Sequence, residues 1–405
     1  MINKKKFDFV LAGYLIALIA LGCIITYSAS TTTIGEYTST QNYWWKQIIF
    51  AVISLLAVYL LLKIPMPIFE LLIVPAYILN ILALILVLFT PAVNGAHRWF
   101  SFLGINYQPS ESAKLLTILV VARAISRDNM TEIKQIFTAL GLTIIPVLLI
   151  LIEPDFGSTL VFFFSLLAML IAAELPLYYI LLMISPVISI ITSFWWIAIV
   201  IWILVLVYLL LRARLSWVTI SIASILNVFL ALITPVFWNS LKDYQQQRIL
   251  SFFNPMADPL GSGYQIIQAK IAVGSGSIFG KGWLGGTQKN MHFLPEHHTD
   301  FIFSVIGEEF GFVGSLVLLG LYFLFFSRLI KDIGEIRVRE RRIASAGIFA
   351  YLLFQTFINI GMNIGLIPAT GIPLPFISYG GSNLLFNSLA IGVILKYLNE
   401  RGLMK

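Results

Sequence analysis

The sequence predicts an all-α protein: a polytopic transmembrane helical bundle of ten to twelve spans with one large external loop. Hydrophobic residues make up 59% of the chain and charged residues only 11%, whereas a soluble domain carries about 25% charged residues. Long apolar runs recur along the chain, each near the roughly 20 residues that a helix needs to cross a bilayer. A transmembrane β-barrel would show short alternating segments instead.

The apolar runs define twelve expected helices. The first follows three lysines and resembles a secretory signal, but we interpret it as an uncleaved helix because it is longer than a signal core and more spans follow. An alternative is that 177–211 forms one broken segment, which reduces the count to ten or eleven. The expected spans are 9–27, 44–63, 68–90, 109–126, 136–153, 157–175, 177–193, 194–211, 216–238, 301–327, 344–364 and 376–398.

Lysine and arginine positions predict the direction of the chain, because cytoplasmic loops are enriched in both. With the N-terminus inside, 18 of the 26 basic residues fall on one side. The sequence therefore predicts a multi-pass protein of the cytoplasmic membrane with both termini in the cytoplasm. Arg212 and Arg214 fall inside only if 177–193 and 194–211 are separate helices, which favours twelve spans.

The whole chain, 1–405, is expected to form a single integral membrane domain. Two sizeable segments lie outside, 91–108 and 239–300, and the second concentrates Gly, Gln, His and charged residues. Cys23 is the one cysteine and lies in the first apolar run, so no intrachain disulfide can form.

Ionisable side chains within apolar runs are costly and therefore mark functional sites by default. Glu111 and Lys114 open the fourth span, in QPSESAK. Being three residues apart, they share a helix face and can pair. Two interpretations stay open: a structural ion pair that orients two helices, and a contribution to a binding site.

Two aspartates stand at external helix ends. Asp155, in EPDFGST, can cap the helix that follows it. Asp300 directly precedes the tenth span, in PEHHTDFIF, where a carboxylate also interacts favourably with the helix dipole. Each aspartate is thus a candidate for chemistry that also has a simpler structural interpretation.

The external histidines and glycines match no known metal or nucleotide motif. The histidines lack cysteines and zinc-site spacing. The glycine-rich segment 274–288 does not fit a P-loop, because Gly282 follows Lys281. We predict no zinc site, no nucleotide site and no nucleic-acid partner. Polar groups that gather near the external face suit a substrate that is part lipid and part polar.

Several long strings resemble one protein family. DYQQQRILSFFNPMADPLGSGYQIIQAKIAVGSGSIFGKGWLGGTQ and FLPEHHTDFIFSVIGEEFGFVG are similar to the large external loop and following helix of the SEDS (shape, elongation, division and sporulation) family, which includes RodA and FtsW. GAHRW, QPSESAK, EPDFGST and NIGMNIGLIPATGIPLPFISYGGSN match further family motifs in the same order. The loop is most similar to the RodA branch. The family typically has ten spans, so 177–238 would hold two extra.

The resemblance implies a peptidoglycan glycosyltransferase that polymerises lipid II, an undecaprenyl-pyrophosphate-linked disaccharide-pentapeptide. Glycan strands would form at the outer face of the membrane during cell elongation, with the catalytic region in loop 239–300. The implied partner is a class B penicillin-binding protein, a transpeptidase. Besides lipid II and membrane lipid, the pyrophosphate suggests a divalent cation, Mg²⁺ or Mn²⁺, as a cofactor.

The family's critical aspartate maps onto Asp300, the expected catalytic base. A carboxylate within reach of a sugar hydroxyl can accept its proton, which is worth about 10²–10⁴-fold in rate. Fixed cations would stabilise the pyrophosphate leaving group. The expected substrate-binding residues are Arg98, Trp99, Glu111, Lys114, Asp155, Lys270, Ser378, Gly380 and Gly381, and Asn383 alters the small-residue end of the last motif.

Two other functions stay open. A lipid II flippase would also have many helices and intramembrane polar groups, although the sequence shows no inverted repeat. A non-catalytic scaffold for a penicillin-binding protein would tolerate the loss of Asp300. A polymerisation assay with labelled lipid II separates the three.

Overall fold

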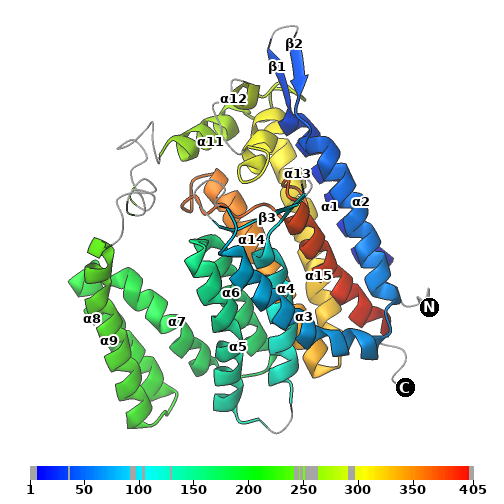
Figure 1. Ribbon diagram of the computed structural model, residues 1–405. Helices are drawn as coiled ribbons and strands as arrows, with labels where there is room; N and C mark the ends of the chain where they lie inside the picture. Colours follow the sequence, from blue (N-terminus) through cyan, green and yellow to red (C-terminus); the bar gives the residue numbers. More distant parts are fainter. Residues whose placement is uncertain are drawn as a thin grey trace.

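The computed structural model describes residues 7–34, 37–91, 97–102, 105–127, 130–240, 246, 250, 263–290 and 297–400. Within these residues the protein is a bundle of helices with two short hairpins (Figure 1). Helix α1 begins and helix α15 ends at the same end of the molecule, while α11, α12 and the first hairpin gather at the opposite end (Figure 1). Much of the expected external loop 239–300, including His292, lies outside the described residues.

Twelve of the described helices match the twelve expected spans in order. Eight of these helices are long and apolar enough to cross a membrane, so the chain is a multi-pass membrane protein. The stretch 177–211 forms two helices rather than one broken segment. The twelve are α1 (Phe9–Ser30), α2 (Tyr43–Lys63), α3 (Met66–Val87), α4 (Pro109–Ile125), α5 (Glu132–Ile152), α6 (Phe156–Ala172), α7 (Leu177–Thr192), α8 (Trp196–Arg212), α9 (Trp217–Ser240), α13 (Ile302–Gly334), α14 (Arg339–Asn363) and α15 (Gly381–Asn399).

The expected start of the last span was wrong. Residues 376–380 are not helical, and α15 begins at Gly381. Phe376 has a φ of +67°, which lies outside the helical region of backbone conformation. Ser378 and Gly380 therefore lie in an irregular segment before the helix rather than inside a span.

The remaining described elements lie in the loops. Strands β1 (Thr31–Ile34) and β2 (Tyr37–Thr40) pair antiparallel, with Thr31 opposite Thr40. Strands β3 (Phe100–Phe102) and β4 (Ile105–Tyr107) form a second antiparallel hairpin. Helices α11 (Tyr264–Ser275) and α12 (Thr287–Asn290) lie in the described part of loop 239–300, which the sequence predicts to be external.

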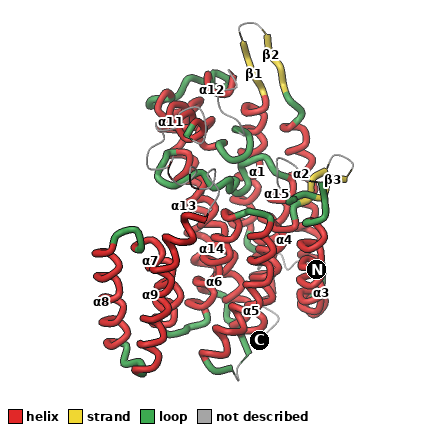
Figure 2. The backbone as a smooth tube through the Cα atoms, turned by 60° about the vertical axis from the view of Figure 1, so that its left-hand side comes forward, coloured by secondary structure: helices red, strands yellow, loops and turns green. Residues whose placement is uncertain are grey.

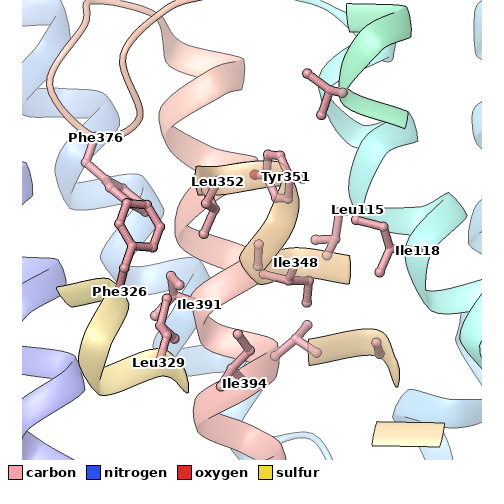
Figure 3. Packing of buried hydrophobic residues seen from close by; sticks show 14 of the residues in the cluster. Leu115, Ile118, Phe326, Leu329, Ile348, Tyr351, Leu352, Phe376, Ile391 and Ile394 are labelled. Atoms are coloured by element: carbon pink, nitrogen blue, oxygen red, sulfur yellow. The ribbon is translucent and has the colours of Figure 1, made fainter. Parts of the chain in front are cut away.

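Helices α14 and α15 form the centre of the bundle. Helix α14 packs against α4, α6 and α13, and α15 packs against α2. These two spans are the most buried of the eight, so most of their side chains face protein instead of lipid. Side chains from four helices meet there, as Figure 3 shows for Leu115, Ile118, Phe326, Leu329, Ile348, Tyr351, Leu352, Ile391 and Ile394.

Helices α7, α8 and α9 form a group of their own beside the bundle, and they stay side by side in both views (Figures 1 and 2). Hydrogen bonds link the three helices. Asn227 of α9 bonds to α7 twice, since its Nδ2 donates to Ser185 Oγ at 3.0 Å and its Oδ1 accepts from Ser189 Oγ at 2.7 Å. Trp202 Nε1 of α8 donates to Ser189 Oγ at 3.0 Å. Such interhelical bonds hold helices together where hydrophobic burial cannot. This group occupies the stretch where two extra helices were expected.

Candidate active site

Asp300 lies in a turn, 297–300, immediately before α13. Its main-chain carbonyl accepts hydrogen bonds from Asn359 Nδ2 at 2.8 Å and from Asn363 Nδ2 at 3.1 Å, both on α14. Its carboxylate lies beside Gly371, because a Cβ placed on that glycine would be 3.4 Å from Asp300 Oδ2. The half-buried side chain therefore faces the segment 370–372 while α14 holds its backbone.

The C-terminal motif holds this turn from the other direction. Ser378 Oγ donates to the carbonyl of Thr299 at 2.5 Å, and the amide of Tyr379 donates to the carbonyl of His298 at 2.9 Å. His298 stacks on Tyr43 at 4.2 Å between ring centroids. Burial, together with the neighbouring His297, lowers the pKa of His298 to about 4, so its ring is neutral at physiological pH.

The motif glycines fit closely against α2. The amide of Gly380 donates to Gln47 Oε1 at 3.4 Å. A Cβ on Gly381 would be 2.6 Å from the ring of Phe50. Ser378 thus contacts the Asp300 turn directly, while Gly380 and Gly381 pack against α2. The expected contact of these residues with substrate stays a prediction.

The turn between α5 and α6 reaches the same segment, 370–372. Asp155 caps α6 as expected, since its Oδ1 accepts from Ser158 N at 3.1 Å and its Oδ2 from Ser158 Oγ at 2.8 Å. Gly157 lies so close that a Cβ there would be 2.8 Å from the carbonyl oxygen of Thr370. Asp155 and Asp300 therefore belong to turns that flank one segment.

Arg98 stiffens the α5–α6 turn. Its Nε donates to the carbonyl of Glu153 at 2.8 Å, and its Nη2 donates to the carbonyl of Pro154 at 2.5 Å. The Glu153 side chain is buried, and neither carboxylate oxygen has a hydrogen-bond partner among the described residues. Burial and the charge of Asp155 raise the pKa of Glu153 to about 8, although Arg98 opposes the shift. Trp99 lies next to Arg98 and is half-buried.

Glu111 and Lys114 form the expected ion pair, with 2.6 Å between Lys114 Nζ and Glu111 Oε1, and both are buried. Asn383 Nδ2 donates to Glu111 Oε2 at 2.9 Å, and Asn387 Nδ2 donates to Asn383 Oδ1 at 3.0 Å. The hydroxyl of Tyr351 donates to Asn387 Oδ1. This chain of polar groups joins α4, α15 and α14, as the structural interpretation requires, while its role in binding stays a prediction.

The expected cations differ in exposure. Lys114 is buried, Arg98 is half-buried, and Lys270 lies exposed on α11. The Lys270 side chain passes over Gly365, just beyond the end of α14, where a Cβ would be 1.7 Å from Lys270 Cε. Lys270 therefore lies near Asn363, which holds Asp300.

Sequence reasoning missed the asparagines that position Asp300. Asn359 and Asn363 lie four residues apart in NIGMN, which places them on one face of α14. Buried polar residues in an otherwise apolar span are the signal that could have identified them. Glu308 and Glu309 are also buried, and they form ion pairs with Lys281 and Lys289.

The described residues contain no group of three or more His, Cys, Asp and Glu side chains that could hold a metal ion. A Mg²⁺ ion that also binds substrate phosphates needs only one or two carboxylates from the protein. Whether Asp155 or Asp300 takes part in such a site stays a prediction.

Comparison with known proteins identifies the family of this chain. The model of the FtsW, RodA and SpoVE family, described as cell cycle proteins, matches residues 9–202 and 196–402. The chain belongs to the FtsW/RodA/SpoVE family. Among curated members, it is 34% identical to the peptidoglycan glycosyltransferase MrdB of Escherichia coli K12, with 99% of this chain and 98% of the relative covered. It is 32% identical to the peptidoglycan glycosyltransferase RodA of Treponema pallidum, with 98% and 99% covered.

Solved structures of this family share the fold. A chain from a peptidoglycan synthase complex, described as coordinating polymerization and crosslinking, matches with a TM-score of 0.72 and 29% identity. The rod shape determining protein RodA of Thermus thermophilus matches with a TM-score of 0.64 and 25% identity. Both matches cover 98% of this chain and 98% of the other. The FtsW/RodA/SpoVE fold thus extends over nearly the whole chain.

Proposed function

We propose that this protein is a peptidoglycan glycosyltransferase that polymerises lipid II into glycan strands at the outer face of the cytoplasmic membrane. Membership of a family whose curated relatives carry that enzyme name supports the reaction class. The observation that carries the site is the placement of Asp300, held through its main chain at 2.8 Å and 3.1 Å by two asparagines of α14. The RodA-like loop supports a role in cell elongation.

In this mechanism Asp300 is the general base. The acceptor sugar hydroxyl loses its proton to the Asp300 carboxylate as its oxygen bonds to the anomeric carbon of the donor. The bond from that carbon to the pyrophosphate oxygen breaks, and the polyprenyl pyrophosphate leaves. A hydroxyl is a weak nucleophile until its proton begins to move, so a fixed carboxylate contributes about 10²–10⁴-fold.

Positive charge would stabilise the leaving pyrophosphate. Lys270 is exposed near the Asp300 turn, whereas Arg98 has two N–H groups committed to the α5–α6 turn. A divalent cation, held by Asp155 or Asp300 and by the pyrophosphate itself, would neutralise the same charge. Chelation with EDTA should then lower the polymerisation rate, and added Mg²⁺ or Mn²⁺ should restore it.

The proposed partner is a class B penicillin-binding protein, which would crosslink the strands. The likeness to a chain of a peptidoglycan synthase complex supports this partner. Both termini would lie in the cytoplasm, which is consistent with α1 beginning and α15 ending at one end of the molecule (Figure 1).

The decisive experiment reconstitutes the purified protein in liposomes with fluorescent lipid II, with and without the cognate transpeptidase. Glycan polymer is expected, and a lysozyme-sensitive ladder on gels would identify it. Transbilayer movement of lipid II without polymer would indicate a flippase. Neither product, together with normal binding of the transpeptidase, would indicate a scaffold.

A further inference from the structure

Helix α13 is broken near its outer end. Gly311 has a φ of 64° and a ψ of −158°, which divides the helix into the pieces 302–310 and 312–334. A break leaves helix N–H and C=O groups without their usual partners. Inside a membrane protein, irregular backbone of this kind persists only where other protein groups satisfy it.

The external loop supplies those partners. Residues 277–282 lie against the break and make four backbone hydrogen bonds with it. Helix α13 donates two of them, from Phe312 N to Ser277 O at 2.9 Å and from Val313 N to Ile278 O at 3.0 Å. It accepts the other two, from Lys281 N to Glu308 O at 3.0 Å and from Gly282 N to Glu309 O at 3.0 Å.

The glycines of this loop allow the two backbones to touch. A Cβ on Gly276 would be 1.9 Å from the carbonyl oxygen of Gly307, and one on Gly280 would be 2.1 Å from that of Glu309. Neither distance is possible for a real side chain. The glycine-rich segment 274–288 is therefore a packing surface for the broken helix.

Two ion pairs close the same junction, of which Lys289–Glu309 is fully buried, whereas Lys281 of the other pair is exposed. Glu308 Oε1 accepts from Lys281 Nζ at 2.7 Å and from Thr287 N at 2.8 Å. Glu309 pairs with Lys289, and neither side chain is exposed. Ser28 Oγ on α1 donates to Glu309 Oε1 at 2.7 Å, and Lys289 Nζ donates to the Ser28 carbonyl at 2.7 Å.

The outer piece of α13 thus connects this junction to the candidate base. Residues 302–309 are all buried. Asp300 stands just before the first of them, and the ion pairs lie at the other end of the piece. If the loop shifted its position against Glu308 and Glu309, residues 302–310 would move as a short rigid helix, and Asp300 would move with them.

We propose that Lys289 and Glu309 are positioning residues, whose buried ion pair, together with Ser28, holds the external loop in the break of α13 and so fixes the Asp300 carboxylate. This inference rests on the proposed polymerase function. Catalytic groups need such support because small displacements cost a large part of the rate.

The chain offers a matched control for simple helix packing. Ser28 and Glu309 join α1 to α13 at the outer end, and an Asp8–Arg328 ion pair joins the same two helices at the other end. If the outer contact only kept α1 against α13, disrupting either end would have similar consequences. If the outer contact positions Asp300, only disruption of that contact should lower the rate constant for glycosidic bond formation.

The test compares wild type, the double variant Lys289→Met/Glu309→Gln and the control Arg328→Gln, each as the full chain with its transpeptidase in liposomes. The double variant removes both charges together, so no buried charge is left uncompensated. The readouts are the single-turnover rate constant for the first glycosidic bond, the KM for lipid II, and hydrogen exchange at the amides of Lys281 and Gly282.

For the double variant we expect at least a tenfold lower rate constant, a KM within threefold of wild type and faster exchange at both amides. Arg328→Gln should keep the wild-type rate constant. A single-turnover rate constant does not depend on the fraction of active protein, so partial misfolding would lower only the amplitude. A wild-type rate constant despite faster exchange, or an equal loss in Arg328→Gln, would overturn the inference.

A glycine pair keeps the inference testable if the double variant does not fold. Gly311→Ala places a Cβ 2.4 Å from Gly280 N and should displace the loop, whereas Gly320→Ala on the same helix meets nothing within 4 Å. Only Gly311→Ala should slow the single-turnover step, and equal rates in the two variants would contradict the proposal. If wild type itself makes no polymer, the proposed function fails first.

Discussion

Asp300 is anchored by hydrogen bonds to its main chain, and its carboxylate lies beside segment 370–372. The two amide groups of Asn359 and Asn363 bind the carbonyl rather than the carboxylate. These two bonds fix the position of the backbone that carries the carboxylate.

Asp300→Asn should abolish polymerisation while expression and transpeptidase binding stay near normal. Asparagine keeps the size of the side chain and the backbone contacts, but it cannot accept the proton. At least a 100-fold loss is expected in the liposome assay. Rates within a few-fold of wild type would remove Asp300 from the role of base.

Glu153 predicts a pH-dependent stability. Its folded-state pKa, about 8, lies above the ordinary value of 4.5, so the folded protein binds the proton more tightly than the unfolded chain does. The resulting stabilisation is complete below about pH 4.5 and is lost as the pH rises through 8. Glu153→Gln should remove this dependence and raise the Tm in detergent by several degrees at pH 8, with little change at pH 5. Parallel Tm curves for the two proteins from pH 5 to 8.5 would argue against a buried neutral carboxyl.

At the scale of helices, polar groups join α4, α14 and α15 where the bundle is most buried. The ion pair Glu111–Lys114 is confirmed, and Asn383 extends it to α15. Asn383 is the residue that departs from the small-residue end of the family motif. Its amide gives the buried Glu111 carboxylate a second partner, which explains why a larger polar residue is accepted there.

Glu111→Ala should harm stability more than the double change Glu111→Ala/Lys114→Ala if the pair is structural. Removing one partner leaves a buried charge uncompensated, at a cost of about 3–5 kcal/mol, and removing both relieves it. Thermal unfolding in detergent measures the difference. Activity then decides the second question, since a stable, active double variant excludes Lys114 as a pyrophosphate ligand, and a stable, inactive one supports it.

At the scale of the molecule, α7, α8 and α9 form three helices between Leu177 and Ser240. Three crossings and one crossing leave loop 239–300 on the same side of the membrane, so function alone does not distinguish them. Helices α7 and α8, with 16 and 17 residues, are shorter than a typical span. Their apolar surfaces nevertheless favour lipid, since Ile191 of α7 and Trp196 and Leu204 of α8 are all exposed.

A cysteine replacing Ala213, beside Arg212, should lie in the cytoplasm. In a Cys23→Ala background it should resist a membrane-impermeant thiol reagent on whole cells and react fully after lysis. The reason is the excess of basic residues on the inner side. A cysteine replacing the exposed Ser275 of α11 is the control and should label from outside. Ready labelling at 213 would replace three crossings with one crossing and helices on the membrane surface.

Helix positions could be predicted from sequence because the bilayer imposes a length and a polarity on each span. All twelve expected helices are present, and the errors lie at their ends, as at 376–380, where Phe376 leaves helical geometry. Local caps could also be predicted, since the Asp155 carboxylate accepts hydrogen bonds from the first turn of its own helix.

By itself, the sequence determined the class of protein, the order of the helices, the family and the identity of Asp300 as the candidate base. Only the tertiary structure decided what surrounds that base: Asn359 and Asn363 from α14, Ser378 against Thr299, and Gly157 against Thr370. It also showed that Lys289 lies buried beside Ser28. The physical reason is range: hydropathy and caps act within one helix, whereas these contacts join residues far apart in the chain whose proximity depends on how the helices pack.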